Sequence, residues 1–124
     1  MTHWRRFLVG VLFTTVLSVV ALVSAQDVVK VSDTHKVLLE NEHVRVMDVH
    51  VKPGEKVAMH SHPAGTLYYL SDAKLKITYP DGKTEERDVK AGTAVWIEAV
   101  THAVENVGST ELHEVHTELK GATK

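Results

Sequence analysis

The residues of this sequence with the clearest chemical potential are its histidines. Nine are present and cysteine is absent, so disulfides and thiolate chemistry are excluded. His60 and His62 are separated by one residue. In a strand, residues two apart point to the same face with Cα atoms about 6.6 Å apart, so both imidazoles can reach one metal ion at about 2 Å. The pair predicts a metal site, although two histidines on a solvated strand face would have the same spacing.

The residues around this pair resemble the two motifs of the cupin family. Residues 54–62 read glycine, five residues and then His-x-His, as in the first motif. Residues 92–106 resemble the second motif, and His102 and Asn106 keep its histidine-to-asparagine spacing. The resemblance extends from about residue 44 to residue 119. It implies an all-β fold, a jelly-roll β-barrel of two antiparallel sheets, whose interior metal is bound by His60, His62 and His102.

The sequence departs from the family pattern where a glutamate usually supplies a fourth ligand. Thr66 stands four residues after His62, and neighbouring Leu67 cannot ligate either. In the second motif, Glu98 and Val100 replace the usual proline and glycine, and the spacing to His102 is one residue short. The chain therefore resembles the three-histidine cupins that are similar to cysteine dioxygenase or acetylacetone dioxygenase.

Three histidines suit one divalent transition metal ion. Fe²⁺ is favoured by the resemblance, and Zn²⁺, Mn²⁺, Ni²⁺ or Cu²⁺ fit the ligand type as well. Two classes of function follow. In the first, the protein is a dioxygenase-like oxidoreductase that acts on a small chelating substrate. In the second, the barrel binds or senses a metal or small ligand and catalyses nothing. Sequence spacing identifies no catalytic residue beside the ligands.

Four further residues are candidates for the surroundings of the metal or the ligand pocket. Thr66 and Tyr68 share one strand face and could lie near the ion, although a core tyrosine is the commoner case. His113 is in phase with apolar residues of its strand, so it either reaches the cavity or is an ordinary buried histidine. Asn106 is expected to stabilise a turn rather than bind substrate. Other side chains have structural interpretations: solvated His35 and His43, Trp96 packed in the barrel, and an exposed strand face at residues 85–88.

The elements that must position these residues are short strands between turns. Turn signals lie at residues 52–55, 80–83 and 90–93, and no stretch after residue 25 keeps a helical apolar period. Many short strands at regular spacing predict a sandwich or barrel. The expected strands are residues 44–51, 67–70, 74–79, 94–97, 102–106 and 111–119.

The first 25 residues form a separate segment. Arg5 and Arg6 precede an uncharged apolar run over residues 7–23, and small residues follow at Ser24 and Ala25. This order predicts a secretory signal peptide cleaved after Ala25 and a periplasmic or secreted protein; an uncleaved membrane anchor is the alternative. Residues 26–124 then form one domain, with its core at residues 44–119.

Charge and composition limit the partners. The net charge of −2 becomes more negative once both N-terminal arginines are removed, and no basic patch is present, so nucleic acid is not an expected partner. We expect a small-molecule substrate or ligand and no stable membrane insertion after cleavage. The resemblance also implies a possible homodimer, because cupins often dimerise through edge strands.

Overall fold

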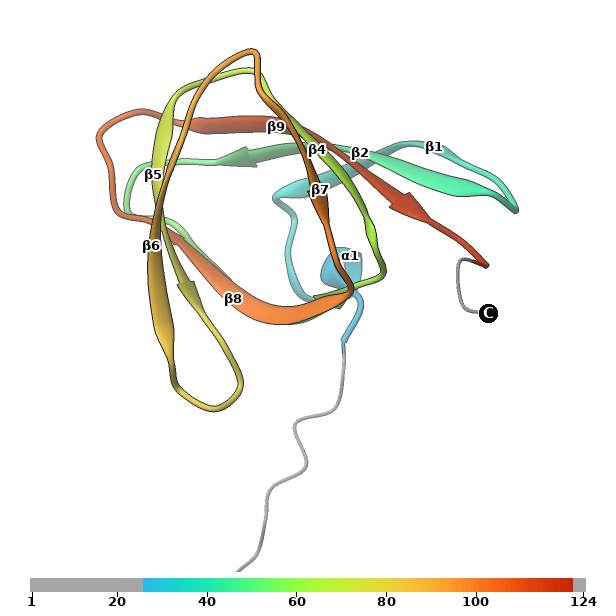
Figure 1. Ribbon diagram of the computed structural model, residues 1–124, viewed down its shortest axis with the longest axis horizontal. Coiled ribbons are helices and arrows are strands. Elements are labelled where there is room, and N and C mark those ends of the chain that lie inside the picture. Colours follow the sequence, from blue (N-terminus) through green and yellow to red (C-terminus); the bar gives the residue numbers. More distant parts are fainter. Residues whose placement is uncertain (1–25, 122–124) are drawn as a thin grey trace, which may run out of the picture.

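A computed structural model describes residues 26–121, which form one short helix and nine strands (Figure 1). The elements in chain order are α1 (Val28–Val31), β1 (His35–Glu40), β2 (Val44–Val51), β3 (Lys56–His62), β4 (Gly65–Tyr69), β5 (Ala73–Thr78), β6 (Thr84–Val89), β7 (Ala94–Ile97), β8 (Val100–Asn106) and β9 (Leu112–Leu119). The expected all-β class is confirmed. The strands predicted at 44–51 and 94–97 match fully, and the other four predicted strands differ by at most two residues at either end.

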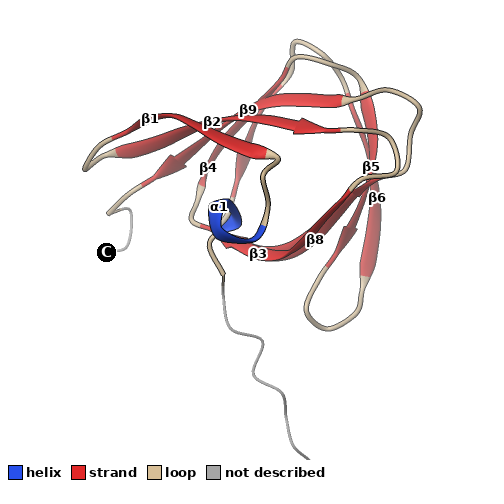
Figure 2. Ribbon diagram, turned by 180° about the vertical axis from the view of Figure 1, so that it is seen from behind, coloured by secondary structure: helices blue, strands red, loops and turns tan. Residues whose placement is uncertain are grey.

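The strands form two antiparallel sheets that face each other. One sheet has the order β1-β2-β9-β4-β7 and the other β3-β8-β5-β6. Helix α1 contacts both β1 and β3 and lies between them in Figure 2. This arrangement places β3 and β9, which carry most of the interior histidines, on opposite walls of a common interior.

The interior is divided into an apolar part and a polar part. Alternate residues of β2 and β5 point inward, among them Val49, Val51, Leu75 and Ile77, and they pack in one hydrophobic core. A second set of buried residues is polar or charged: Arg45, His60, His62, Glu114, His116 and Glu118. Burying an ionisable group costs free energy unless the group is paired, hydrogen-bonded or bound to a metal. The polar part of the interior is therefore the candidate functional site.

The predicted turns are formed by glycines with a left-handed backbone. Gly54, Gly82 and Gly92 have φ angles of 80°, 85° and 81°, a region that side chains strongly disfavour. In the β5–β6 hairpin, the amide of Tyr79 donates to the carbonyl of Lys83 at 2.9 Å. These turns fix the register of the strands that reach the site.

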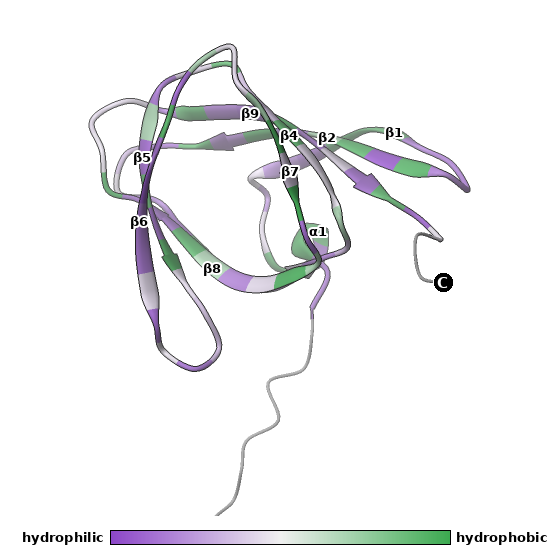
Figure 3. Ribbon diagram, viewed as in Figure 1, coloured by the Kyte–Doolittle hydropathy of each residue, from purple (hydrophilic) through white to green (hydrophobic). Residues whose placement is uncertain are grey.

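Two expectations about side chains were wrong. Trp96 does not pack inside the barrel: it is 53% exposed and its indole Nε1 donates to Glu98 at 2.9 Å. It lies on β7, an edge strand whose even-numbered residues face solvent. The segment 85–88 is exposed except for Arg87, which is half-buried and points inward because β6 alternates like the other strands. Figure 3 shows the otherwise hydrophilic character of β6.

The predicted signal peptide, residues 1–25, lies outside the described residues. Within residues 26–121, no helix has the length and apolar character needed to cross a bilayer.

Candidate metal centre

The three histidines selected from the sequence come together on neighbouring strands of one sheet. His60 and His62 lie on β3, and His102 lies on β8 directly opposite His60 in the register. Their ring centroids are 4.6 Å apart for His60 and His62, 4.8 Å for His60 and His102, and 5.6 Å for His62 and His102. One ring nitrogen from each lies within 4.8 Å of the others. This spacing allows three nitrogens to converge on one ion.

Hydrogen bonds determine which nitrogens face the site. Nδ1 of His60 lies 2.6 Å from the carbonyl oxygen of Ala58, and Nδ1 of His62 lies 2.6 Å from Oε2 of Glu118. A carbonyl or a carboxylate can only accept, so both Nδ1 atoms carry the proton and donate it. The Nε2 lone pairs of His60 and His62 are then free, which is how protein metal sites orient their imidazoles.

A buried ionic chain supports His62. Glu118 accepts from Nε of Arg45 at 2.7 Å, and the Arg45 guanidinium also makes two hydrogen bonds to Asp27, at 2.8 and 2.9 Å. Burial disfavours the charge on Glu118, but hydrogen bonds from His62 and Arg45 outweigh burial and hold its pKa below the ordinary value. The carboxylate therefore stays ionised and continues to accept the hydrogen bond from the His62 ring.

Two of the three histidines, His60 and His102, are neutral at physiological pH. Burial lowers the pKa of His60 to about 4, although its hydrogen bond to Ala58 opposes the shift. Burial, together with the neighbouring histidines, lowers the pKa of His102 to about 3. Only the neutral imidazole has a lone pair for a metal, so the interior holds these side chains in their ligand form.

Two more histidines join this cluster. His35 at the start of β1 and His116 on β9 form a second group with His62, in which one nitrogen from each lies within 4.8 Å of the others. The rings of His62 and His116 are 4.3 Å apart. The prediction of a solvated His35 was wrong: it is half-buried, and burial lowers its pKa to about 2. Strand β1, which carries it inward, was not among the predicted strands.

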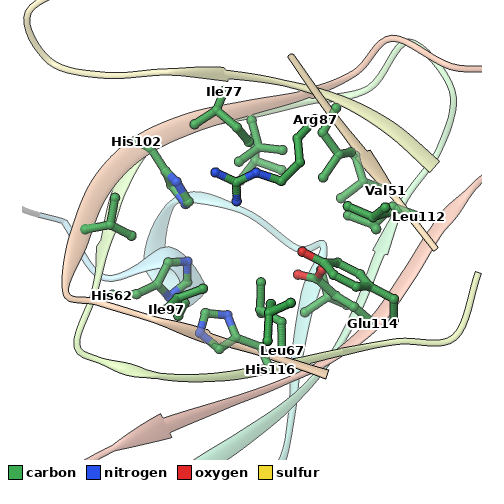
Figure 4. A pocket seen from close by; sticks show the side chains of 18 of the residues that line it. Val51, His62, Leu67, Ile77, Arg87, Ile97, His102, Leu112, Glu114 and His116 are labelled. Carbon is green, nitrogen blue, oxygen red and sulfur yellow. The ribbon is translucent and has the colours of Figure 1, made fainter. Parts of the chain in front are cut away.

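The histidines line one side of a cavity of about 590 Å³ (Figure 4). The remaining wall is mostly apolar: Val49, Val51, Val57, Leu67, Leu75, Ile77, Val95, Ile97, Val104 and Leu112. Figure 4 shows Arg87 reaching into the cavity, with Glu114 on the side away from His62 and His102. A cavity of this size and lining suits a small, largely apolar molecule with a few polar groups.

The polar groups away from the histidines include a carboxyl that titrates near neutrality. Burial raises the pKa of Glu114 to about 7, although the nearby Arg87 guanidinium opposes the shift. Burial and the charge of Glu114 raise the pKa of Tyr69 to about 12. The side chain of Glu114 lines the cavity. Glu114 is therefore free to exchange a proton with a bound molecule.

Thr66 and Tyr68 do not belong to the site, which corrects their predicted placement. Strand β4 buries Gly65, Leu67 and Tyr69 and exposes the residues between them, and Tyr68 is 44% exposed. The sequence pattern of β4 has apolar residues at both parities, so the inward face could not be identified from it. Leu67 and Tyr69 are the cavity residues of this strand.

His113 is also misplaced in the prediction. It lies on the outer face of β9, where Nε2 is 2.8 Å from Asp48 and the ring stacks on His50 at 4.0 Å. The inward residues of β9 are the opposite set: Leu112, Glu114, His116 and Glu118. Asp48, His50 and His113 form an outer-face group whose ligand atoms also lie within 4.8 Å of one another.

Asn106 stabilises a turn, in agreement with the turn interpretation rather than a pocket role. It is fully buried, its amide donates to the carbonyls of Val51 and Thr110 at 2.8 Å each, and its oxygen accepts from Gly108 at 3.0 Å. It is not among the residues that line the cavity.

Comparison with known proteins agrees with this architecture. Residues 47–117 match the Cupin_2 family, described as a cupin domain. A cupin domain from Bordetella pertussis Tohama I is 26% identical with a TM-score of 0.65, over 70% of this chain and 92% of that one. An RmlC-like cupin family protein with a double-stranded β-helix fold from Methanocaldococcus jannaschii is 18% identical with a TM-score of 0.57, over 73% of this chain and 82% of that one.

A third structure, the polyketide cyclase RemF from Streptomyces resistomycificus, is 21% identical with a TM-score of 0.52, over 68% of this chain and 63% of that one. At this identity the similarity of RemF and of the M. jannaschii protein concerns the fold alone. No curated protein matches the chain.

Proposed function

Because this chain belongs to the Cupin_2 family, we propose that it holds one divalent transition metal ion on His60, His62 and His102 and binds a small molecule beside the ion in the barrel cavity. The observation that carries the proposal is the orientation of the ligands. Nδ1 of His60 and of His62 donates to an acceptor, so both Nε2 lone pairs are available, and His102 lies within ligand distance of both. Histidines that bind metals almost always donate their other ring N–H to a carboxylate or a carbonyl oxygen in this way.

The finer proposal is a dioxygenase-like reaction on a small chelating substrate. Three imidazole ligands would leave coordination positions open for a bidentate substrate and dioxygen, and an iron(II) ion would supply the redox chemistry. The residues of the chain position the substrate and exclude water: the apolar wall surrounds its body, and Arg87 and Tyr69 offer donors. Glu114, with a pKa of about 7, can accept or return a proton at its carboxylate.

The alternative is a barrel that binds a metal or small ligand and catalyses nothing. The position of Glu114 favours the enzyme, since a buried carboxyl that lines the cavity and titrates near neutral pH can exchange a proton with a bound molecule.

Metal binding is tested by substituting one ligand. We expect His62→Ala to lower the affinity for Zn²⁺, Co²⁺ or Fe²⁺ by about 100-fold or more, because it removes a ligand and leaves Glu118 without its imidazole partner. Calorimetric titration of the metal-free protein measures the affinity, and the metal-dependent rise in melting temperature should disappear as well. His43→Ala is the matched control, since that side chain is 77% exposed. Wild-type protein that binds no ion at micromolar concentrations would refute the metal function.

The reaction is tested separately by oxygen uptake. The iron-loaded protein is offered a panel of small β-dicarbonyl compounds and thiol acids, with His62→Ala as the blank. We expect at least one substrate to give uptake well above the blank, and the same uptake to fall in Glu114→Gln. Uptake equal to the blank for every substrate would favour the binding protein.

A further inference from the structure

A histidine on β9, His116, has a buried ring nitrogen without a partner in the described part of the chain. His116 is 2% exposed, and its Nε2 has no hydrogen-bond partner among the described residues. Buried polar atoms are nearly always satisfied, so an orphaned one needs an occupant that the protein atoms do not provide.

The neighbours of His116 suit a metal ion. His35, His62 and His116 come from β1, β3 and β9, and one ring nitrogen from each lies within 4.8 Å of the others. The rings are inclined to one another, at 31° for His35 and His62 and 49° for His62 and His116. Nδ1 of His35 is 2.8 Å from the hydroxyl of Thr34, which leaves its Nε2 toward the group. Each of the three imidazoles can offer one ring nitrogen, and three protein nitrogens are a sufficient ligand set for a divalent transition metal ion.

We propose that His35, His62 and His116 form a second position for a divalent transition metal ion, an alternative to the position at His60, His62 and His102. The two positions share His62. Because Glu118 occupies its Nδ1, His62 has a single free lone pair, and that lone pair can serve one ion at a time. The protein therefore binds one ion in the cavity, and two sets of histidines compete for it. This inference rests on the proposed metal function of the same cluster.

The proposal predicts that the two sets can substitute for each other. Every protein in this experiment, the reference included, carries His113→Ala, so that the outer-face group of Asp48, His50 and His113 does not bind an ion. Zn²⁺ binding is measured by equilibrium dialysis and Co²⁺ binding by its visible spectrum. We expect His102→Ala to retain one ion with an affinity about 10- to 100-fold weaker. In that background, His116→Ala should abolish the remaining binding, and so should His35→Ala. The Co²⁺ spectrum of His102→Ala should differ from that of His116→Ala, since each variant keeps a different ligand set.

The outcomes separate this proposal from the proposed function. If His102→Ala binds no ion, or if the added His116→Ala leaves its residual binding unchanged, the second position does not exist and a buried water satisfies His116. If His116→Ala alone abolishes binding while His102→Ala binds as wild type, the second position is the metal site and the first one is refuted. If neither the wild type nor any variant binds an ion, both the proposed metal function and the second position are refuted. His35 is half-buried, so His35→Ala provides a variant that should fold even where His116→Ala does not.

Discussion

At the scale of single residues, burial sets the protonation states of the site. His60, His102 and His116 are kept neutral and so able to ligate a metal, whereas Glu114 is kept partly protonated at neutral pH. Both effects have one cause, since an environment of low polarity disfavours a positive imidazolium and a negative carboxylate alike. Glu118 is the exception, because Arg45 and His62 compensate its charge.

The raised pKa of Glu114 predicts a specific pH dependence of stability. Its folded pKa of about 7 lies above the ordinary glutamate value of 4.5, so between these values the folded state binds more protons than the unfolded state. Stability contributed by the protonated carboxyl is therefore fully present below pH 4.5 and is lost as the pH rises through 7. Glu114→Gln, which does not titrate, should gain stability over the wild type across this window, by up to about 3 kcal/mol at pH 8.

Urea unfolding of the metal-free proteins between pH 4.5 and 8 measures this difference. Glu86→Gln is the control, because Glu86 is exposed on β6 and should leave the profile parallel to that of the wild type. A Glu114→Gln profile that is also parallel to the wild type would show that the carboxyl titrates normally.

At the scale of elements, strands β4 and β9 lie so close that one position excludes any side chain. Gly65 of β4 is buried, and a Cβ placed on it would overlap the backbone carbonyl of Thr117 on β9. The residues next to Thr117, His116 and Glu118, belong to the polar interior. Close approach of these two strands therefore sets the position of part of the histidine cluster.

Gly65→Ala is expected to destabilise the protein by about 3 kcal/mol, since the backbone must shift to make room for the methyl group. It should also weaken metal binding, because the shift moves β9. The unfolding midpoint in urea and a Zn²⁺ titration report the two effects. Thr66→Ala, on the exposed face of the same strand, should change stability by no more than about 0.5 kcal/mol. Equal stability of Gly65→Ala and wild type would contradict the strand spacing described here.

At the scale of the whole molecule, the first described residues, Gln26 and Asp27, are connected to the site. The amide of Ser61 on β3 donates to the carbonyl of Gln26 at 2.7 Å, and Asp27 binds Arg45, which in turn binds Glu118 and so reaches His62. The start of the described chain thus supports the ligands through a continuous chain of hydrogen bonds. Gln26 and Asp27, the residues that would follow the proposed cleavage point, therefore have a structural role.

Export remains a proposal and has a direct test. We expect the protein recovered from the periplasmic or secreted fraction to begin at Gln26, because the small residues Ser24 and Ala25 follow an apolar run and present a cleavage site. N-terminal sequencing or intact mass spectrometry measures this. Substituting Ala25 with a large residue should block processing and leave the precursor. Recovery of an intact N-terminus from the membrane fraction would indicate an anchor instead.

Local sequence patterns were sufficient to predict much of this protein. The alternation of β-branched residues and the turn glycines predicted the all-β class and six of the strands, because a strand and a tight turn depend on a few neighbouring residues. The spacing of His60 and His62 predicted a metal-binding pair, and the resemblance to the cupin motifs added His102; the structure places one ring nitrogen of each within 4.8 Å of the others.

Tertiary structure alone decided which further residues share the interior with them. Strand β9 carries polar residues on both faces, so its pattern could not show that His116 and Glu118 point inward and His113 outward. Strand β1 is largely exposed and lacks an alternating signal, yet its first residue, His35, lies beside the cluster. These residues meet because two sheets close on each other, and the contacts made by that closure join positions far apart in the chain, which no local pattern records.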